Sequence, residues 1–296
     1  MRVRTRFTGI SHGTETLVMR GQVPESEWTR MRSPFQEGDF SFPVKYGYLN
    51  VGVVEEGPRN LIGRTVFTLF PHQSLFVVPS AAVAVVPNGV PARRAVLAGA
   101  VETAVNVLWD AAPRLGDTVA IVGAGMIGGA LAALAARIPG ADVTLIDVDQ
   151  RKRHLADGLG VGFAHPEDVA RDYDIVIEAS GTGEGLASAL RAAATDGEVV
   201  VASWYGSTPQ QIDLGSDFHS RRLTLRASQV GEVAAARRGR RTTRERLELA
   251  LRLLEDDVFD TLLGDDSPWT DLPAVMSALA AGTSSGLCHT IDWSRP

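Results

Sequence analysis

The chain has 296 residues, which predicts two domains at about 100–200 residues each. Hydrophobic residues make up 45% and charged residues 22%, which excludes a wholly disordered chain, and the net charge of −6 argues against nucleic-acid and anionic-membrane partners. The single cysteine, Cys288, excludes an internal disulfide framework and a cysteine-rich zinc site. We expect a cytoplasmic protein, because no apolar run reaches the roughly 18 residues that span a bilayer and no signal-peptide pattern follows the basic N-terminus.

The first 100 residues are expected to be rich in β-strands. Short β-branched runs at 51–54, 65–70 and 76–78 are separated by Gly, Pro and Asn, as in a small barrel or sandwich. A helix is expected over 92–109, because apolar residues recur there at spacings of three and four.

Beyond Gly116 the pattern changes to strands that alternate with helices. The expected strands are 118–122, 142–146, 174–178, 198–202 and 223–227, and the expected helices are 128–137, 151–160 and 185–194. This alternation predicts a parallel sheet with helices on both faces, and therefore an α/β fold with a β-rich partner domain. Two helices, 244–254 and 272–281, and a strand, 287–291, are expected to close the chain.

A glycine loop, Gly123-Ala124-Gly125-Met126-Ile127-Gly128, follows an expected strand and opens an expected helix. In such a loop the first glycine permits the tight turn, the second lets the backbone approach a pyrophosphate, and the third allows close packing of helix and strand. The helix start at Met126 and Ile127 offers unpaired N–H groups and a partial positive charge. The loop therefore predicts a dinucleotide site.

Asp147 lies 19 residues after Gly128, at the end of the next expected strand. A carboxylate there can accept both ribose hydroxyls of the adenosine and repels a 2′-phosphate, so we expect NAD(H) in preference to NADP(H). NADP remains the alternative, because Arg151, Lys152 or Arg153 could reach a 2′-phosphate.

Further segments extend this pattern along nearly the whole chain. They are Gly9-Ile10-Ser11-His12-Gly13-Thr14-Glu15, the stretch from Phe42 to Gly57, Gly116-Asp117-Thr118-Val119, Glu178-Ala179-Ser180-Gly181 and Ser220-Arg221-Arg222-Leu223-Thr224-Leu225. With the glycine loop, they make the chain resemble the medium-chain dehydrogenase/reductase superfamily, the relatives of zinc alcohol dehydrogenase.

The resemblance implies a GroES-like β-barrel catalytic domain over 1–100 and 228–296 and a doubly wound Rossmann NAD-binding domain over 101–227. It also implies a homodimer formed by edge strands, for which 198–203 is the candidate. Members usually carry about two more strands before the segment that begins here at Met1, so we expect either an upstream start or a trimmed barrel.

The family's catalytic zinc ligands are not matched. Gap-free matching puts His12 at the first cysteine, Tyr48 and Leu49 at the histidine–glutamate pair, and Gly99 at the last cysteine. One ligand of four does not hold Zn²⁺, and one cysteine cannot build the structural zinc lobe. We therefore expect neither metal site.

Without zinc, a side chain has to pass the proton during hydride transfer. Tyr48 is the first candidate, with Lys45 nearby to lower its pKa, and His12 is the second. Glu102 is a third candidate, because it adjoins Thr103, whose counterpart in the family that the chain resembles lies near the nicotinamide. For His72 we expect a surface turn.

The resemblance also places four residues near the nicotinamide or the phosphates of the cofactor. These are Thr103, Ser180, Ser203 and Trp204, in addition to the glycine loop, Asp147 and Lys152.

The arginine-rich stretch 237–246 is interpreted as a solvated loop that enters a helix, with Thr242 or Thr243 as the N-cap. A phosphate or nucleic-acid patch is the alternative, which the acidic balance of the domain disfavours.

Two functions of different classes follow. The first is a zinc-independent, NAD(H)-dependent oxidoreductase that acts on an alcohol or carbonyl of a small molecule, with quinone or enoyl C=C reduction as its variant. The second is an inactive dinucleotide-binding sensor or subunit.

Overall fold

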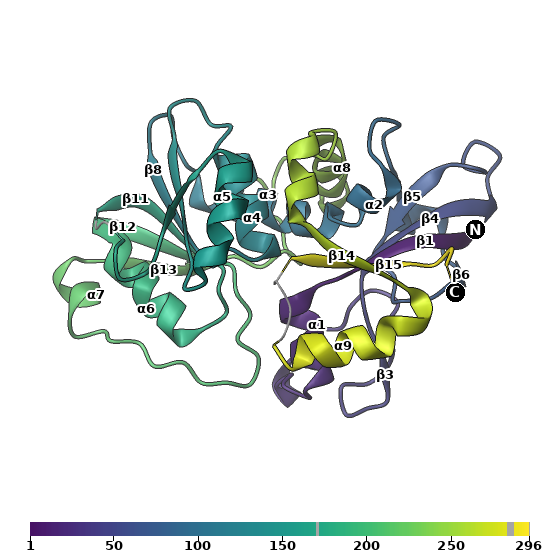
Figure 1. Ribbon diagram of the computed structural model, residues 1–296, viewed down its shortest axis with the longest axis horizontal. Coiled ribbons are helices and arrows are strands. Elements are labelled where there is room, and N and C mark those ends of the chain that lie inside the picture. Colours follow the sequence, from purple (N-terminus) through teal and green to yellow (C-terminus); the bar gives the residue numbers. More distant parts are fainter. Residues whose placement is uncertain (170–171, 283–286, 296) are drawn as a thin grey trace. The chain divides into compact units, whose positions relative to one another are not determined.

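The computed structural model describes residues 1–169, 172–282 and 287–295 (Figure 1). It divides into two compact units, unit 1 (Met1–Gly99 and Leu247–Pro296) and unit 2 (Ala100–Arg246). The second division therefore falls after Arg246 rather than at the expected 227/228, because residues 228–246 are bound to unit 2.

Unit 1 is built on one mixed sheet with the order β14-β15-β1-β4-β5-β7, in which β6 also pairs with β1. The strands of this sheet are β1 (Arg2–Ile10), β4 (Leu49–Glu56), β5 (Thr65–Thr68), β6 (Leu75–Val77), β7 (Val83–Val85), β14 (Leu263–Pro268) and β15 (Cys288–Asp292). A separate pair consists of β2 (Glu37–Gly38) and β3 (Val44–Lys45). The sheet buries an aliphatic and aromatic core that includes Val3, Val66, Phe70 and Phe76.

Two helices of unit 1 contact each other, α1 (His12–Met19) and α9 (Leu272–Ala280). Ile10, Leu279 and Ile291 form the small core that joins α9 to the sheet. Ser11 joins β1 to α1, and the first turn of α1 carries the polar residues Thr14 and Glu15.

Unit 2 is a six-stranded parallel sheet with the order β10-β9-β8-β11-β12-β13. Its strands are β8 (Thr118–Val122), β9 (Asp142–Ile146), β10 (Gly162–Ala164), β11 (Tyr173–Glu178), β12 (Ala193–Val201) and β13 (Thr224–Ala227). Its helices include α4 (Met126–Ala135), α5 (Arg153–Leu159), α6 (Gly183–Ala192) and α7 (Asp217–Ser220). This is the doubly wound order in which two halves start from the central strand β8 and run in opposite directions.

The expected combination of a β-rich unit and a doubly wound α/β unit is confirmed. The helix expected over 92–109 is two helices, α2 (Ala92–Ala95) and α3 (Ala98–Ala111), and the arginine-rich stretch leads into α8 (Thr243–Leu253). Helix α1 and the short strands β10 and β14 were not expected.

The expected edge strand is not at an edge. Residues 198–201 belong to β12, which pairs with β11 on one side and β13 on the other, and Val199 and Val200 are fully buried. A run of valines is typical of such an interior parallel strand. The edges of the described sheet are β10 and β13.

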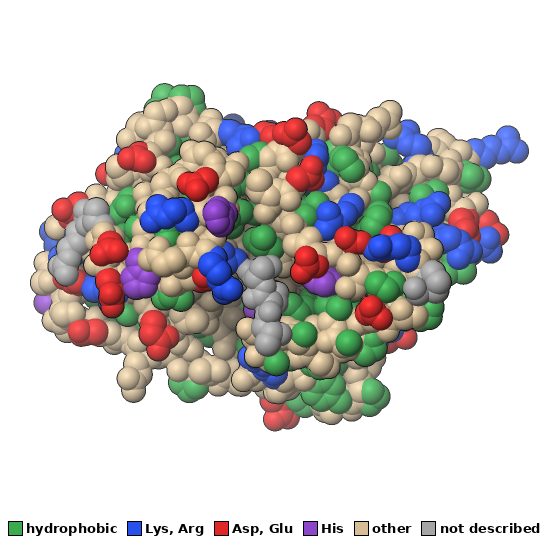
Figure 2. All heavy atoms as spheres, viewed as in Figure 1, with side chains coloured by type: hydrophobic (Ala, Val, Ile, Leu, Met, Phe, Trp, Pro, Cys, Tyr) green, Lys and Arg blue, Asp and Glu red, His purple; other side chains and the backbone are tan. Residues whose placement is uncertain are grey.

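Two surface properties bear on possible partners. No helix in the described part of the chain is long and apolar enough to cross a bilayer. On the face drawn in Figure 2, acidic and basic side chains are interspersed.

Candidate functional site

The glycine loop connects β8 to α4 and is closed by main-chain contacts. Gly123 has a φ of +102°, and a Cβ there would lie 2.6 Å from the amide nitrogen of Ser180. A Cβ on Gly128 would overlap the carbonyl oxygen of Gly123. Both positions therefore require glycine. Gly125 is the N-cap of α4 and, because it has no side chain, makes no side-chain capping hydrogen bond to the first N–H groups of the helix.

Asp147 follows β9 and ties the loop to it. Its Oδ2 accepts a hydrogen bond from the Ala124 amide at 2.7 Å, and its Oδ1 accepts one from the Asp149 amide at 2.9 Å. Arg151 is exposed and pairs with Asp149 at 2.8 Å. Lys152 is half-buried, and this burial lowers the pKa of its ammonium group. The negative charges of Asp147 and Asp149 act in the opposite direction but do not cancel the effect of burial on this pKa.

A buried carboxylate lies at the carboxyl end of β11. Glu178 is fully buried, and its Oε1 accepts hydrogen bonds of 2.6 Å from both the amide and the hydroxyl of Ser180. Its Oε2 accepts one from the Tyr205 hydroxyl at 2.7 Å. Burial and the charge of Glu178 raise the pKa of Tyr205, so this phenol stays protonated. The Ser203 hydroxyl oxygen accepts a hydrogen bond of 2.9 Å from the neighbouring Gly181 amide.

Glu178 and Tyr205 were missed as site residues by sequence reasoning. The only signal was the position of Glu178 at the end of an apolar strand, next to Ser180.

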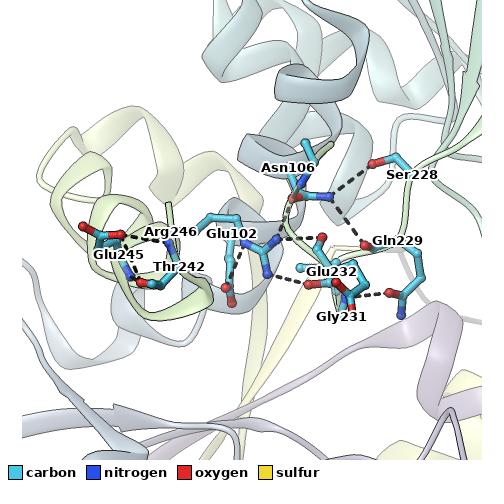
Figure 3. Close-up of polar contacts among 11 residues, drawn as sticks. Glu102, Asn106, Ser228, Gln229, Gly231, Glu232, Thr242, Glu245 and Arg246 are labelled. Atoms are coloured by element: carbon cyan, nitrogen blue, oxygen red, sulfur yellow. Dashed lines mark hydrogen bonds and ion pairs between the residues drawn. The ribbon is translucent and has the colours of Figure 1, made fainter. Parts of the chain in front are cut away.

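Glu102 and Thr103 lie in α3. The Glu102 carboxylate is buried and accepts a hydrogen bond from Arg246 at 3.1 Å (Figure 3). Burial raises its pKa, and Arg246 opposes that shift. Glu102 is therefore engaged by a guanidinium, not by solvent. Thr103 and Trp204 are half-buried.

The residue expected to relay the proton, Tyr48, lies in unit 1 directly before β4. Its hydroxyl interacts with the side chains of Ser11 and Thr14, on the turn that begins α1. Burial, aided by the negative charge of Glu15, raises its pKa to about 12, and the two hydroxyl groups partly oppose this. The Tyr48 phenol therefore holds its proton at neutral pH.

The expected effect of Lys45 on Tyr48 is wrong. Lys45 donates a 2.6 Å hydrogen bond to Glu37 and a second one to Gln73. Its ammonium thus serves other partners, and the pKa of Tyr48 is raised rather than lowered.

His72 does not lie on a surface turn. Its side chain is 9% exposed, with Nε2 2.9 Å from the Glu15 carboxylate and Nδ1 2.7 Å from the Thr8 hydroxyl. The Thr8 hydroxyl oxygen also accepts a hydrogen bond from the Trp293 indole N–H at 2.9 Å. The Thr8 hydroxyl can therefore donate its proton to His72 Nδ1, and the proton on His72 Nε2 can be donated to Glu15. Gly47 makes room for the ring, because a Cβ there would lie 2.8 Å from His72 Cδ2.

The polar group of unit 1 therefore consists of Tyr48, Ser11, Thr14, Glu15 and His72. The Ser11 amide donates to Glu15 at 2.8 Å, which links the carboxylate to the turn that holds the Tyr48 hydroxyl. His12 is the first residue of α1 and lies on this same turn. The group offers a protonated phenol beside a buried carboxylate–imidazole pair.

The donor atoms of this region do not fit a four-ligand zinc. Leu49 is buried against Gly99, where two ligands would have to lie, and a Cβ on Gly99 would overlap the leucine side chain. Cys288 is fully buried, and burial raises the pKa of its thiol to about 12. Across residues 1–169, 172–282 and 287–295, no three His, Cys, Asp or Glu residues could together hold a metal ion. The zinc-free site stays a prediction.

Comparisons with known proteins agree with this architecture. A family profile described as "Zinc-binding dehydrogenase" matches residues 127–256. D-guloside 3-dehydrogenase of Escherichia coli is 26% identical over 249 residues, which are 74% of this chain and 71% of that protein.

Among solved structures, L-idonate 5-dehydrogenase of Escherichia coli superposes with a TM-score of 0.78 at 16% identity, over 99% of this chain and 90% of the other. Acetophenone reductase of Geotrichum candidum, in complex with NAD, gives 0.77 at 16% identity, over 98% and 89%. Residues 127–256 thus match the zinc-binding dehydrogenase family, and the relatives and the fold support the resemblance of the chain to the medium-chain dehydrogenase/reductase superfamily.

Proposed function

We propose that the protein is an NAD(H)-dependent, zinc-independent oxidoreductase that moves hydride between the nicotinamide and the carbon of an alcohol or carbonyl group. The observation that carries the proposal is the glycine loop, tied to Asp147 in a doubly wound sheet. The curated relatives support the reaction class, because D-guloside 3-dehydrogenase and 2-dehydro-3-deoxy-L-galactonate 5-dehydrogenase are both dehydrogenases by name.

The cofactor preference rests on the groups around Asp147. Its carboxylate would accept the adenosine ribose hydroxyls and repel a 2′-phosphate. Arg151, which could have favoured NADP(H), is held by Asp149. Lys152 interacts electrostatically with both Asp147 and Asp149, and the Arg153 guanidinium lies over the Phe163 ring, 4.9 Å from its centroid.

We assign to Tyr48 the donation of a proton to the substrate oxygen during carbonyl reduction. A phenol with a raised pKa can donate a hydrogen bond to a substrate carbonyl, and then a proton as hydride arrives at the carbon. The buried Glu15–His72 pair keeps a negative charge near this phenol, which favours its protonated form. His12, on the same turn, is the alternative donor.

The test combines cofactor titration with a substrate panel. NADH and NADPH binding would be followed by the nicotinamide fluorescence, and turnover would be assayed on polyols, aldehydes, ketones, quinones and enones. Carbonyl reduction or alcohol oxidation with NAD(H) is expected. Turnover on quinones or enones alone would replace the carbonyl reaction by C=C or quinone reduction, and cofactor binding without any turnover would point to a sensor or subunit.

A further inference from the structure

Arg246 is the largest fully buried side chain of the described residues, at 1% exposure, although it ends a stretch expected to be solvated. Its Nε donates to Glu102 at 3.1 Å, and its Nη1 donates to the Asn106 side-chain oxygen at 2.5 Å and to the Glu232 carbonyl at 3.1 Å. Its Nη2 donates to the Val230 carbonyl. Figure 3 shows this guanidinium between α3 and the segment that follows β13.

The segment held by this group, residues 228–234, contains no helix or strand. Asn106 binds it as well, because its amide nitrogen lies 3.5 Å from the Gln229 carbonyl and its oxygen accepts the Ala234 amide at 2.9 Å. Arg246 and Asn106 thus hold four main-chain groups of one irregular segment. Burying an ion pair is costly and seldom adds net stability over apolar packing, so the cluster points to a need for one defined conformation.

Residues 228–234 lie at the edge of the parallel sheet where a ligand is expected to bind. The Ser228 amide donates to the Val201 carbonyl at 2.9 Å, so the segment starts at the carboxyl edge of β12 and β13. In a doubly wound sheet, ligands bind at this edge, one mononucleotide on each half. Asp147 follows β9 in the first half, which receives the adenosine, so β11, β12 and β13 form the half that receives the nicotinamide.

We propose that Arg246 is a positioning residue for the nicotinamide half of the cofactor. Braced by Glu102 and Asn106, it fixes the main chain of 228–234, so that this part of the binding surface needs no ordering when the dinucleotide arrives. The inference rests on the proposed function, because it requires a dinucleotide to be bound. It also gives Glu102 a role through Arg246 instead of at the reacting atoms.

The test compares two probes, NADH and ADP-ribose, on the purified full chain by calorimetry at a temperature where each variant is folded. Arg246→Lys keeps the charge but loses the planar fork, and Glu102→Gln keeps the shape but loses the charge. We expect the Kd of NADH to rise about tenfold in Arg246→Lys, and less in Glu102→Gln, while the Kd of ADP-ribose stays within about twofold.

Arg94→Lys is the matched control. Arg94 is also buried, pairs with Asp260 at 2.6 Å and donates to the Leu254 carbonyl at 3.3 Å, but it belongs to unit 1. Its replacement should lower thermal stability without a selective loss of NADH affinity.

Equal weakening of both probes in Arg246→Lys would show that Arg246 merely stabilises unit 2, and unchanged affinity for both would remove its role altogether; either result overturns the positioning role alone. Failure of the unaltered protein to bind NADH would instead overturn the proposed function, and this inference with it.

Discussion

The glycine loop of unit 2 and the polar group of unit 1 are built in different ways. The loop works through main-chain atoms: Gly123 and Gly128 are required by close approach, and Asp147 binds the Ala124 amide. The polar group works through side chains from separate segments, with Glu15 from α1, His72 from the segment between β5 and β6, and Tyr48 from the residue before β4. A main-chain site tolerates few backbone changes, whereas a side-chain site is sensitive to single functional groups.

The largest expected effect tests the side-chain site. Tyr48→Phe removes only the hydroxyl, so kcat on a good carbonyl substrate should fall by about 10²–10⁴-fold, while the Kd of NADH is unchanged. Because burial raises the Tyr48 pKa to about 12, loss of its proton should not limit the unaltered enzyme below about pH 10. Steady-state kinetics as a function of pH would measure both.

His12→Ala is the companion variant to Tyr48→Phe. A larger loss of kcat in His12→Ala than in Tyr48→Phe would identify the His12 imidazole, instead of the Tyr48 phenol, as the proton donor. Near-full turnover in both would leave a water relay or direct C=C reduction as the better account.

The next effect tests the main-chain site. Gly128→Ala places a methyl group on the Gly123 carbonyl, so the loop has to move away from the pyrophosphate, and the Kd of NADH should rise by about 100-fold. Gly239→Ala, where a Cβ meets nothing within 4 Å, is the control in the same unit. Equal NADH affinity in the two variants would contradict the assignment of the loop.

Cofactor choice should change by a smaller factor. Asp147→Ser removes the carboxylate that would oppose a 2′-phosphate, so the preference for NADH over NADPH should narrow by about tenfold. Fluorescence titration with both cofactors measures this ratio. If the unaltered protein binds NADPH more tightly, Lys152 rather than Asp147 decides the preference.

The smallest effect concerns the packing that supports the His72–Glu15 pair. Gly47 has a φ of +114° and lies against the His72 ring, so Gly47→Ala should lower the free energy of unfolding by about 1–3 kcal/mol. Gly13→Ala, where a Cβ meets nothing within 4 Å, should have little effect. Urea unfolding of the two variants compares them, and equal stability would show that the ring moves freely.

The glycine loop can be predicted from the sequence and the polar group cannot, because the first is built from neighbouring residues and the second from distant ones. The glycine loop is local, so a strand, a turn and a helix within about 30 residues were enough to identify it. The polar group depends on antiparallel pairing of β1 with β4 and on a hydrogen bond between residues 57 positions apart, Glu15 and His72. Nothing in the local pattern around His72 reports such a partner.

Two cations illustrate the limit further. The proximity of Lys45 and Tyr48 in the chain predicts that they interact, but Lys45 donates hydrogen bonds to Glu37 and Gln73 instead. The run of arginines before Arg246 predicts a solvated side chain, whereas Arg246 is 1% exposed. Arg246 lies four residues before the buried Ala250 and five before the buried Leu251, which places it on the buried stripe of α8, a signal that its charge obscures.

The burial of Cys288 has a practical consequence for spectroscopy. Its thiol is fully buried and, with a pKa raised to about 12, carries almost no thiolate at neutral pH. Alkylating reagents should therefore leave the native chain unlabelled. A cysteine introduced at an exposed position such as Ile62 or Leu115 would then take up a fluorophore or spin label alone. Pairs of such labels, one on each unit, would report the distance between the units in solution, with and without dinucleotide, and the native thiol would not have to be removed.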